Sequence, residues 1–392
     1  MRDVVIVGAM RTAIGDFLGS LKDVSAVDLG VIAFKAALSK AGVAPSLIEE
    51  VATGHVYQAG CKGNPSRQVT LGAGCPVETV SVTINQQCPS SMRAAEIISQ
   101  EIMLGKIDIG AAVGIESMTN VPYLLLKARS GYRMGAGKLE DGMLYDALID
   151  AFYNYHQGIT AENLAEKYNI TRQEQDELAL LSHQRACAAI KDGKLKDEIV
   201  PVEIKTKNGT VLFDTDEHPN FNTTMESLAK LKPAFKKDGT VTAGNASAIN
   251  DAACAAILMG DDKAAELGIK PLARIVATAS ASVAPNFMGI GVVPAVNRAL
   301  KLANMKSDDI DIWEINEAFA AQFLACNREL KLDMAKVNVN GSGLSLGHPV
   351  GNTGLRLVIA TINELKRRNK KFGCASLCAG GGPAMATIIE VL

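Results

Sequence analysis

Apolar, β-branched runs alternate with segments of helical periodicity through the first 120 residues of the chain. The strand-like runs are DVVIVGA, EEVATGHV, VSVTIN and IGAAVGIES, and AVDLGVIAFKAALSKAG between the first two has the spacing of an amphipathic helix. Such alternation is typical of a parallel sheet covered by helices on both faces. The pattern therefore predicts an α/β fold.

The pattern is repeated later in the chain. AALSKAGVAPSLIEEVATGHV (36–56) matches RALKLANMKSDDIDIWEINEA (298–318), with an offset of 299 − 37 = 262 residues. A second match, between VSVTINQQCPSSMRAAEIISQEIMLGK and VNVNGSGLSLGHPVGNTGLRLVIATINELKR, aligns Cys88 with His348 at an offset of 348 − 88 = 260. We expect two similar halves, whose equivalent loops bring Cys88 and His348 together near a pseudo-twofold axis.

The stretch between the repeats differs in character, with polar helices followed by a loop-rich segment. We interpret 119–249 as an inserted loop domain that covers the site. The N-terminal half is then 1–118 plus about 250–268, and the C-terminal half is 269–392. Within the insertion, 121–144 is apolar and glycine-rich without a helical period, which favours an oligomer contact.

The composition and charge exclude several classes of protein. A length of 392 residues, 48% hydrophobic and 21% charged, indicates a compact protein of two or three domains. With a net charge of −2 and no basic run interleaved with aromatics, no nucleic-acid partner is expected. No apolar segment reaches the roughly 18 residues of a membrane span, and the core-type strand that starts at the fourth residue leaves no room for a signal peptide. We expect a cytoplasmic protein that does not bind membranes.

The eight cysteines lack the regular spacing of a disulfide framework, so reduced thiols are expected. Cys374 and Cys378 are four residues apart without a nearby histidine, so no metal site is expected. Cys88 is the thiol with a special setting, because Pro89 suits the first turn of a helix. The periodic apolar positions of that helix are Met92, Ala95, Ile98 and Ile102. A helix N-terminus favours the nucleophilic thiolate, although a small buried hydrophobe is the ordinary alternative.

Three further residues could take part in chemistry. His348 lies in the glycine-rich loop NGSGLSLGHPVGNTG, which reads as a shaped loop at a second helix start. Cys378 opens CAGGGPA, where backbone N–H groups could face a developing oxyanion. Asn316 follows the strand IDIWEI and could equally be a helix cap. Each of the three has an ordinary structural interpretation when taken alone.

Taken together and in order, these motifs resemble the thiolase family, in particular its short-chain acetyl-CoA acetyltransferases, along the whole chain. The motifs that carry the resemblance are RTAIGDFLGSLKDVSA, GNPSRQ, NQQCPSSMRA, YHQGITAENLA, KLKPAFKKDGTVTAGNAS, NEAFAAQ, NVNGSGLSLGHPVGNTG and CAGGGPA. The resemblance implies duplicated α/β halves in five layers, α-β-α-β-α, with an inserted loop domain. It also implies the reversible Claisen condensation of two acetyl-CoA molecules to acetoacetyl-CoA and CoA.

By that resemblance Cys88 accepts the acyl group and His348 helps to form its thiolate. Cys378 is the acid/base, and Asn316 with His348 polarises the thioester oxygen. The backbone N–H groups of Cys88 and Gly380 hold the second oxyanion. The resemblance further implies a homotetramer, a dimer of dimers, that uses coenzyme A thioesters as substrates without another cofactor. The implied lining of the acyl and pantetheine tunnel is Leu148, His156, Phe235, Ala243, Ser247, Met288, Ala318 and Phe319.

The chain departs from the family pattern beside both cysteines. Pro89 replaces a small residue after the nucleophile, and Pro383 with Ala384 ends the glycine loop. Asn220 stands where relatives often carry a cation, and Phe287 replaces a smaller residue. These departures leave two alternatives open: a degradative 3-ketoacyl-CoA thiolase of broader chain length, and a thiolase-like protein that binds acyl-CoA or lipid without turnover. A nicotinamide dehydrogenase is excluded because GAMRTAIG lacks the GxGxxG spacing.

Overall fold

The computed structural model describes residues 2–207 and 209–392. In the part before the insertion and directly after it, the chain forms a mixed sheet flanked by helices. Its elements are β1 (Val4–Thr12), β2 (Gly15–Asp16), α1 (Ala26–Ala41), η1 (Pro45–Leu47), β3 (Glu50–Gly54), α2 (Pro65–Gly72), β4 (Val80–Ile84), α3 (Ser90–Met103), β5 (Ile109–Ser117), β11 (Asn250–Gly260) and α7 (Asp261–Glu266).

The C-terminal part repeats this order. Its elements are β12 (Ala273–Ser282), η3 (Pro285–Gly291), α8 (Val292–Ala303), η4 (Ser307–Asp309), β13 (Ile312–Ile315), α9 (Ala320–Leu330), α10 (Gly343–Leu346), α11 (Val350–Arg368), β14 (Phe372–Cys378) and β15 (Pro383–Val391). The short helices η1 and η4 begin 307 − 45 = 262 residues apart, and α3 and α11 begin 350 − 90 = 260 apart. The helical and strand elements therefore recur at the offsets found in the sequence.

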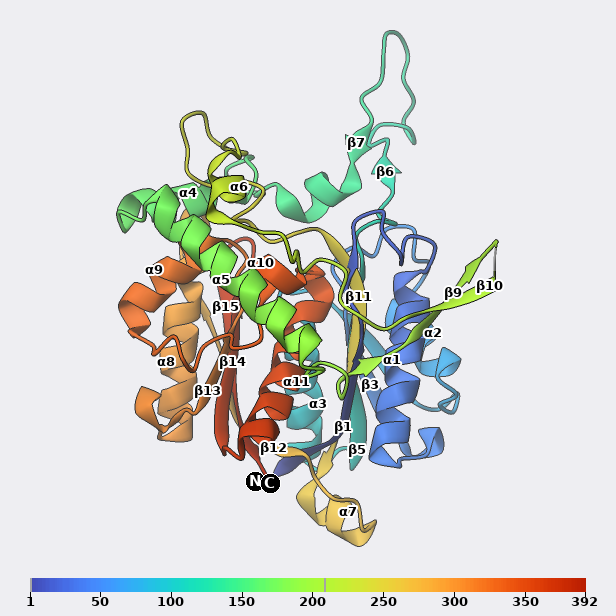
Figure 1. The fold of residues 1–392 in the computed structure, drawn as a ribbon. Helices are drawn as coiled ribbons and strands as arrows, with labels where there is room; N and C mark the ends of the chain where they lie inside the picture. The colour runs from blue at the N-terminus through green and yellow to red at the C-terminus, as the bar shows by residue number, and fades with distance from the viewer. Residues whose placement is uncertain (1, 208) are drawn as a thin grey trace.

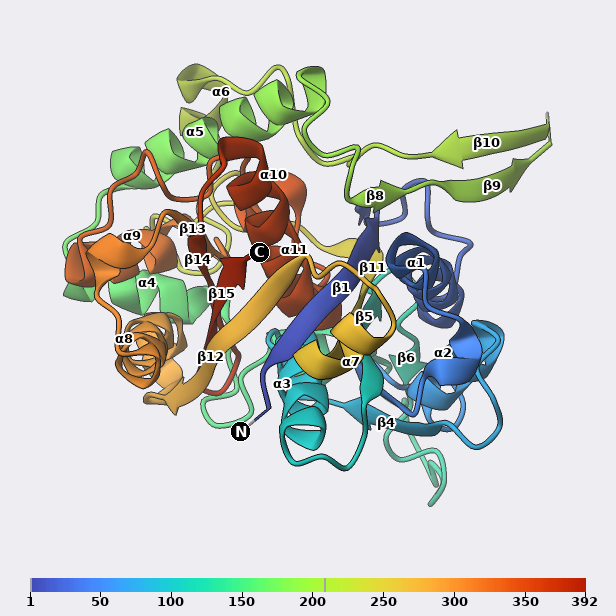
Figure 2. The same cartoon turned by 90° about the horizontal axis from the view of Figure 1, so that it is seen from below.

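The two halves form successive layers. Figure 2 shows α8, the sheet with β12 and β15, the helices α3 and α11, the sheet with β1 and β5, and then α1. Strand β1 is buried on both faces: Val4 and Ile6 pack with the middle helices, and Val5 and Val7 pack with α1. The five layers predicted from the sequence are thus present.

The sheets are mixed, which corrects the prediction of a parallel sheet. The strand order β4-β3-β5-β11-β1 continues into β12-β15-β14-β13 through a short antiparallel contact of β1 with β12. β3 is parallel to β4 and β5, and β13 is parallel to β14, but β11 and β15 are antiparallel to both of their neighbours.

Chain connections explain the antiparallel strands. β14 ends at Cys378 and β15 begins at Pro383, so the short turn between them reverses the chain. β11 runs antiparallel to β5 because the insertion leaves the end of β5 and enters β11 at the same end of the sheet, where Asp251 pairs with Ser117. The turn from β14 to β15 contains no helix, and the insertion between β5 and β11 lies over one end of the sheets (Figure 1), so the rule that links alternation to parallel strands does not apply to these two pairs.

The inserted segment lies over one end of the two sheets and includes a projecting hairpin, β6 with β7 (Figure 1). Its elements are β6 (Tyr123–Leu124), β7 (Glu140–Asp141), a π-helical turn η2 (Leu144–Leu148), α4 (Gly158–Lys167), α5 (Arg172–Lys191), β8 (Ile199–Val200), β9 (Val202–Thr206), β10 (Gly209–Phe213) and α6 (Met225–Ala229). The boundaries 119 and 249 stay a prediction. Among the helices of the described residues, none is long and apolar enough to cross a membrane.

Glycines let the middle helices approach their neighbours closely. A methyl group at Gly54 would lie 2.2 Å from the backbone nitrogen of Ser91, in the first turn of α3. A methyl group at Gly354 of α11 would lie 2.8 Å from the backbone nitrogen of Met92. Backbone atoms cannot move aside as a flexible side chain can. These two glycines therefore determine how closely the middle helices approach their neighbours.

We expect Gly54→Ala to destabilise the protein by about 1–3 kcal/mol, because the added methyl group overpacks against the α3 backbone. Urea unfolding measures this effect. Gly63→Ala is the matched control, since nothing lies within 4 Å of its added methyl group. Equal stability of the two variants would contradict the close-packing argument.

Candidate active site

Cys88 lies in the turn that joins β4 to α3. Gln87, immediately before it, has a left-handed backbone with φ 56°. Ser90 fixes this turn, because its N–H and its hydroxyl both donate to the Gln87 carbonyl, at 3.0 and 2.5 Å. The helix begins at Ser90, with Pro89 as the residue before it, so the thiol stands at a helix N-terminus as predicted.

Two backbone donors face the Cys88 sulfur. Burial raises the pKa of Cys88 to about 12, and hydrogen bonds from the N–H groups of Gly380 and of Cys88 itself act in the opposite direction. In the resting protein the group is therefore a thiol at neutral pH. Pro89 removes no donor from this pair, because the two N–H groups belong to other residues.

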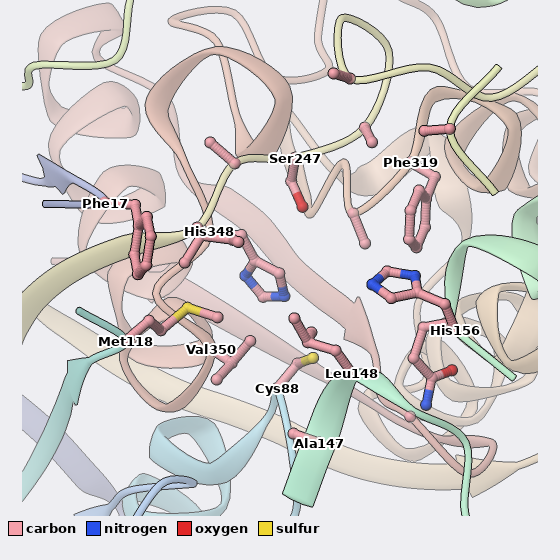
Figure 3. A pocket seen from close by; sticks show the side chains of 18 of the residues that line it. Phe17, Cys88, Met118, Ala147, Leu148, His156, Ser247, Phe319, His348 and Val350 are labelled. Atoms are coloured by element: carbon pink, nitrogen blue, oxygen red, sulfur yellow. The ribbon is translucent and has the colours of Figure 1, made fainter. Parts of the chain in front are cut away.

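His348 is held so that one ring nitrogen is available. Its Nδ1 lies 2.7 Å from the Thr353 hydroxyl oxygen, and that hydroxyl donates to the Pro349 carbonyl at 3.0 Å. The Thr353 oxygen therefore accepts from Nδ1–H, which leaves Nε2 with its lone pair. Burial, together with the positive charge of Arg356, lowers the pKa of His348 from 6.5 to about 3. The ring is neutral and faces the Cys88 thiol (Figure 3).

Polar contacts between the two halves hold this loop in place. Asn250 of β11 accepts the backbone N–H of His348 at 2.9 Å. Glu116 of β5 accepts the N–H of Gly351, in the first turn of α11, at 2.9 Å, and also those of Val56 and Tyr57. A buried carboxylate at a helix N-terminus is stabilised by the helix dipole. The N-terminal half thus fixes the start of the helix that follows His348.

Asn316 adjoins the histidine. Its amide nitrogen lies 3.4 Å from each ring nitrogen of His348, and its Oδ1 is buried without a partner in the described residues. A methyl group at Gly343 would lie 2.6 Å from that oxygen. Asn316 does not cap a helix: α9 begins only at Ala320, with Phe319 before it. The helix-cap alternative for Asn316 is therefore wrong, and its side chain instead adjoins the His348 ring.

Cys378 ends β14, just before the glycine turn. It is buried, and its pKa is raised well above its usual value by burial and by the nearby Cys88 and Cys326 thiols. The turn is closed by the Ala379 N–H, which donates to the Pro383 carbonyl at 2.8 Å. Pro383 is the first residue of β15, a strand position that tolerates proline, and Cys378 is the last residue of β14.

A cavity of about 570 Å³ opens beside Cys88 and His348. Every residue that the sequence assigned to the acyl and pantetheine tunnel lines it: Leu148, His156, Phe235, Ala243, Ser247, Met288, Ala318 and Phe319. Gly380 lines it too, whereas Asn316 and Cys378 lie buried next to the lining residues. The structure thus brings the predicted residues of both halves and of the insertion to one place.

Ring contacts shape one wall of the cavity. The His156 ring stacks on Phe235 with centroids 4.5 Å apart, and Phe235 meets Phe319 edge to face at 6.1 Å. His156 Nδ1 accepts the Gly158 N–H at 3.0 Å, so its proton is on Nε2. Burial lowers the pKa of His156, which keeps the ring neutral. This wall is apolar and rigid apart from one N–H donor.

Several lining residues were missed in the sequence. Phe17, Met118 and Val350 lie on the other side of His348 from His156 (Figure 3). Gln157 lines the cavity beside Gly380. Phe17 and Gln157 fall inside two quoted motifs, which could have drawn attention to them, but nothing in the local pattern of Met118 indicated the site.

The described residues contain no group of three or more His, Cys, Asp or Glu side chains placed to hold a metal ion. The arrangement instead joins a thiol, a neutral imidazole, a second thiol and an amide at the end of an apolar cavity. Such a set can perform acyl transfer through a covalent thioester, with proton transfers between sulfur, nitrogen and carbon.

Comparisons with known proteins agree with this geometry. The family model described as "Thiolase, N-terminal domain" matches residues 4–262, and "Thiolase, C-terminal domain" matches 269–391. The acetyl-CoA acetyltransferase of Syntrophomonas wolfei is 49% identical over 395 residues, and that of Escherichia coli K12 is 48% identical over 393, each covering 100% of both chains.

Solved structures match equally well. The structure of the S. wolfei acetyl-CoA acetyltransferase has a TM-score of 0.99 at 49% identity and covers 100% of both chains. Human mitochondrial 3-ketoacyl-CoA thiolase has a TM-score of 0.98 at 43% identity, covering 100% of this chain and 99% of that one. The chain therefore belongs to the thiolase family.

Proposed function

We propose that the protein is an acetyl-CoA C-acetyltransferase, which condenses two acetyl-CoA molecules reversibly to acetoacetyl-CoA and CoA. The observation that carries the proposal is the Cys88 thiol, which faces a neutral His348 and the N–H groups of Cys88 and Gly380 beside a cavity of about 570 Å³. Full-length relatives named acetyl-CoA acetyltransferase support the same activity.

In the first half-reaction, Nε2 of His348 takes the proton of Cys88, and the thiolate attacks the thioester carbonyl of acetyl-CoA. The N–H groups of Cys88 and Gly380 hold the tetrahedral oxyanion, and each such donor is worth about 3–4 kcal/mol in the transition state. The CoA thiolate leaves and takes a proton from Cys378. Acetyl-Cys88, a Cys378 thiolate and a protonated His348 remain.

In the second half-reaction, the Cys378 thiolate removes the α-proton of a second acetyl-CoA. Asn316 and His348 donate to the enolate oxygen, and the carbanion attacks acetyl-Cys88. The Cys88 thiolate that is expelled takes back the proton of His348, so the resting state is restored. The high pKa of Cys378 suits this step, because it makes the thiolate a strong base.

The proposed reaction uses coenzyme A thioesters as its substrates and no other cofactor. Short acyl groups suit the site, because the large apolar side chains of Leu148, Met288 and Phe319 are part of the cavity lining. A degradative 3-ketoacyl-CoA thiolase of broader chain length is the second candidate, supported by the match to the human mitochondrial enzyme. A binding protein without turnover would have no use for two thiols and a histidine at one site.

Thiolysis of 3-ketoacyl-CoA substrates of increasing length tests the proposal. We expect kcat/KM to be highest for acetoacetyl-CoA and to fall by about tenfold or more for a six-carbon substrate, because the cavity wall excludes the added carbons. Leu148→Ala should reduce this ratio, whereas Leu302→Ala, on the exposed side of α8, should not. Equal rates across the series would favour the broader degradative activity, and no thiolysis at all would contradict the proposal.

The low pKa of His348 predicts the acid side of the pH profile. Burial favours the neutral imidazole, which is the form that accepts the Cys88 proton, so this base stays competent as the pH falls through 6.5. The kcat/KM for acetoacetyl-CoA, which reports ionisations of the free enzyme, should therefore stay flat from about pH 8 down to about pH 5. A decline of about tenfold per pH unit that begins near 6.5 would show that His348 is an ordinary, solvated histidine.

Assembly and location complete the proposal: a cytoplasmic homotetramer, built as a dimer of dimers. The projecting hairpin supports a subunit contact, because Tyr123, Leu125, Leu126 and Met134 are exposed on it. Exposed Val80 and Val82 lie on β4, a sheet edge open to pairing. Light scattering should give a mass of four chains of 41.3 kDa. A monomer at micromolar concentration would contradict the tetramer.

A further inference from the structure

The side chain of Gln157 is a buried amide in the wall of the cavity. Its side chain is only 7% exposed, and Oε1 has no partner in the described residues. The backbone at this position is fixed, because the Gln157 N–H donates to the Leu148 carbonyl at 2.8 Å and its carbonyl accepts from Thr160. The amide therefore has a defined place, and its Oε1 is left without a partner among the described residues.

The amide lies beside the oxyanion donors. A methyl group at Gly380 would lie 2.7 Å from Gln157 Nε2, so only a glycine allows the amide to sit there. The N–H of the same Gly380 points at the Cys88 sulfur. Apolar side chains that line the same cavity include Ala147, Leu148, Met288 and Phe319. Gln157 is thus a polar group placed where an acyl group bound to Cys88 would begin.

A buried amide without partners is costly. Leaving such a donor or acceptor unpaired costs about 1–3 kcal/mol, and proteins seldom keep one that no ligand or ordered water satisfies. A methionine or leucine would fill the same space in an apolar wall without this cost. The acetyl group has no polar atom beyond its thioester oxygen, so it gives the amide nothing to bind.

We propose that Gln157 is a specificity-determining residue, which binds a neutral oxygen on the acyl group, one or two carbons beyond the thioester carbon. This inference rests on the proposed function, and it extends the acyl groups from acetyl to short hydroxyacyl groups. A hydroxyl oxygen suits the site, because Nε2 of the amide can donate a hydrogen bond to it. The position follows from the place of the amide beside Gly380, which holds the thioester oxygen.

The charges around the cavity exclude an acidic acyl group. No lysine or arginine is among the residues that line it, and His156 and His348 are neutral because burial lowers both pKa values. His218 also lines the cavity, but its Nδ1 lies 2.8 Å from Oδ1 of Asp16, so it already has a carboxylate partner. A carboxylate would be buried without a counter-charge, which costs far more than an unpaired hydroxyl.

Pairs of acyl-CoA compounds of equal size test the proposal. Glycolyl-CoA and propionyl-CoA differ only by a hydroxyl in place of a methyl group, as do 3-hydroxybutanoyl-CoA and 3-methylbutanoyl-CoA. Acylation of Cys88 is followed by peptide mass with each compound. We expect the hydroxyl member of at least one pair to acylate about tenfold faster, and Gln157→Met to abolish or reverse that ratio. Gln173→Met, on the exposed side of α5, should leave it unchanged.

The ratio within a pair does not depend on the fraction of folded protein, so partial unfolding of Gln157→Met cannot imitate the expected result. A wild-type ratio of one or below in both pairs would overturn the inference. So would an equal loss for all four compounds in Gln157→Met, because it would mean that the amide acts on the thioester oxygen. Acetyl-CoA is included as a reference: failure of wild-type acetylation would instead overturn the proposed function, and with it this inference.

Discussion

The close contact between helices α3 and α11 is the constraint on which the rest of the site depends. Ser91, in the first turn of α3, donates its hydroxyl to the Asn352 carbonyl of α11 at 3.0 Å and accepts the N–H of Leu355 at 2.9 Å. A methyl group at Gly114 of β5 would collide with both helices, at 2.6 Å from Ser91 Cβ and 2.9 Å from Asn352 Cα. The two helices are therefore held with their N-termini together. Cys88 and His348, which precede these helices, consequently lie close to each other.

Burial then determines the protonation states of Cys88 and His348. It raises the pKa of Cys88 and lowers that of His348, so both groups rest in their neutral forms. Charge develops only when substrate is bound, and the fixed N–H groups of Cys88 and Gly380 are already in place for it. Because these donors do not have to reorient, the site can stabilise an oxyanion without holding a charged pair in the resting state.

Much of this arrangement could be predicted from the sequence, for physical reasons. The repeat at offsets of about 260 residues identified the equivalent helix starts, and a duplicated fold must bring equivalent loops together. The setting of Cys88 before a helix was readable from local pattern alone. The roles of Cys378 and Asn316 came from the family resemblance, because each has an ordinary interpretation as a turn or a cap.

Other features could not be read from local patterns. The directions of β11 and β15 depend on where their connections leave and return, and alternation of strands and helices carries no information on that. The lining of the cavity is assembled from the insertion and both halves, so Met118 became visible only in three dimensions. Gln157 stands out because its buried Oε1 has no hydrogen-bond partner among the described residues, and a sequence does not show whether a buried atom is paired.

The central claim is that Cys88 is the acyl acceptor of a site shared by the two halves. Peptide mass after mixing the purified protein with acetoacetyl-CoA, without added CoA, tests it most directly. We expect a single acetyl group on the Cys88 peptide, absent in Cys88→Ser. An unmodified Cys88, or an acetyl group on another cysteine, would contradict it and leave the cavity as a binding site without covalent chemistry.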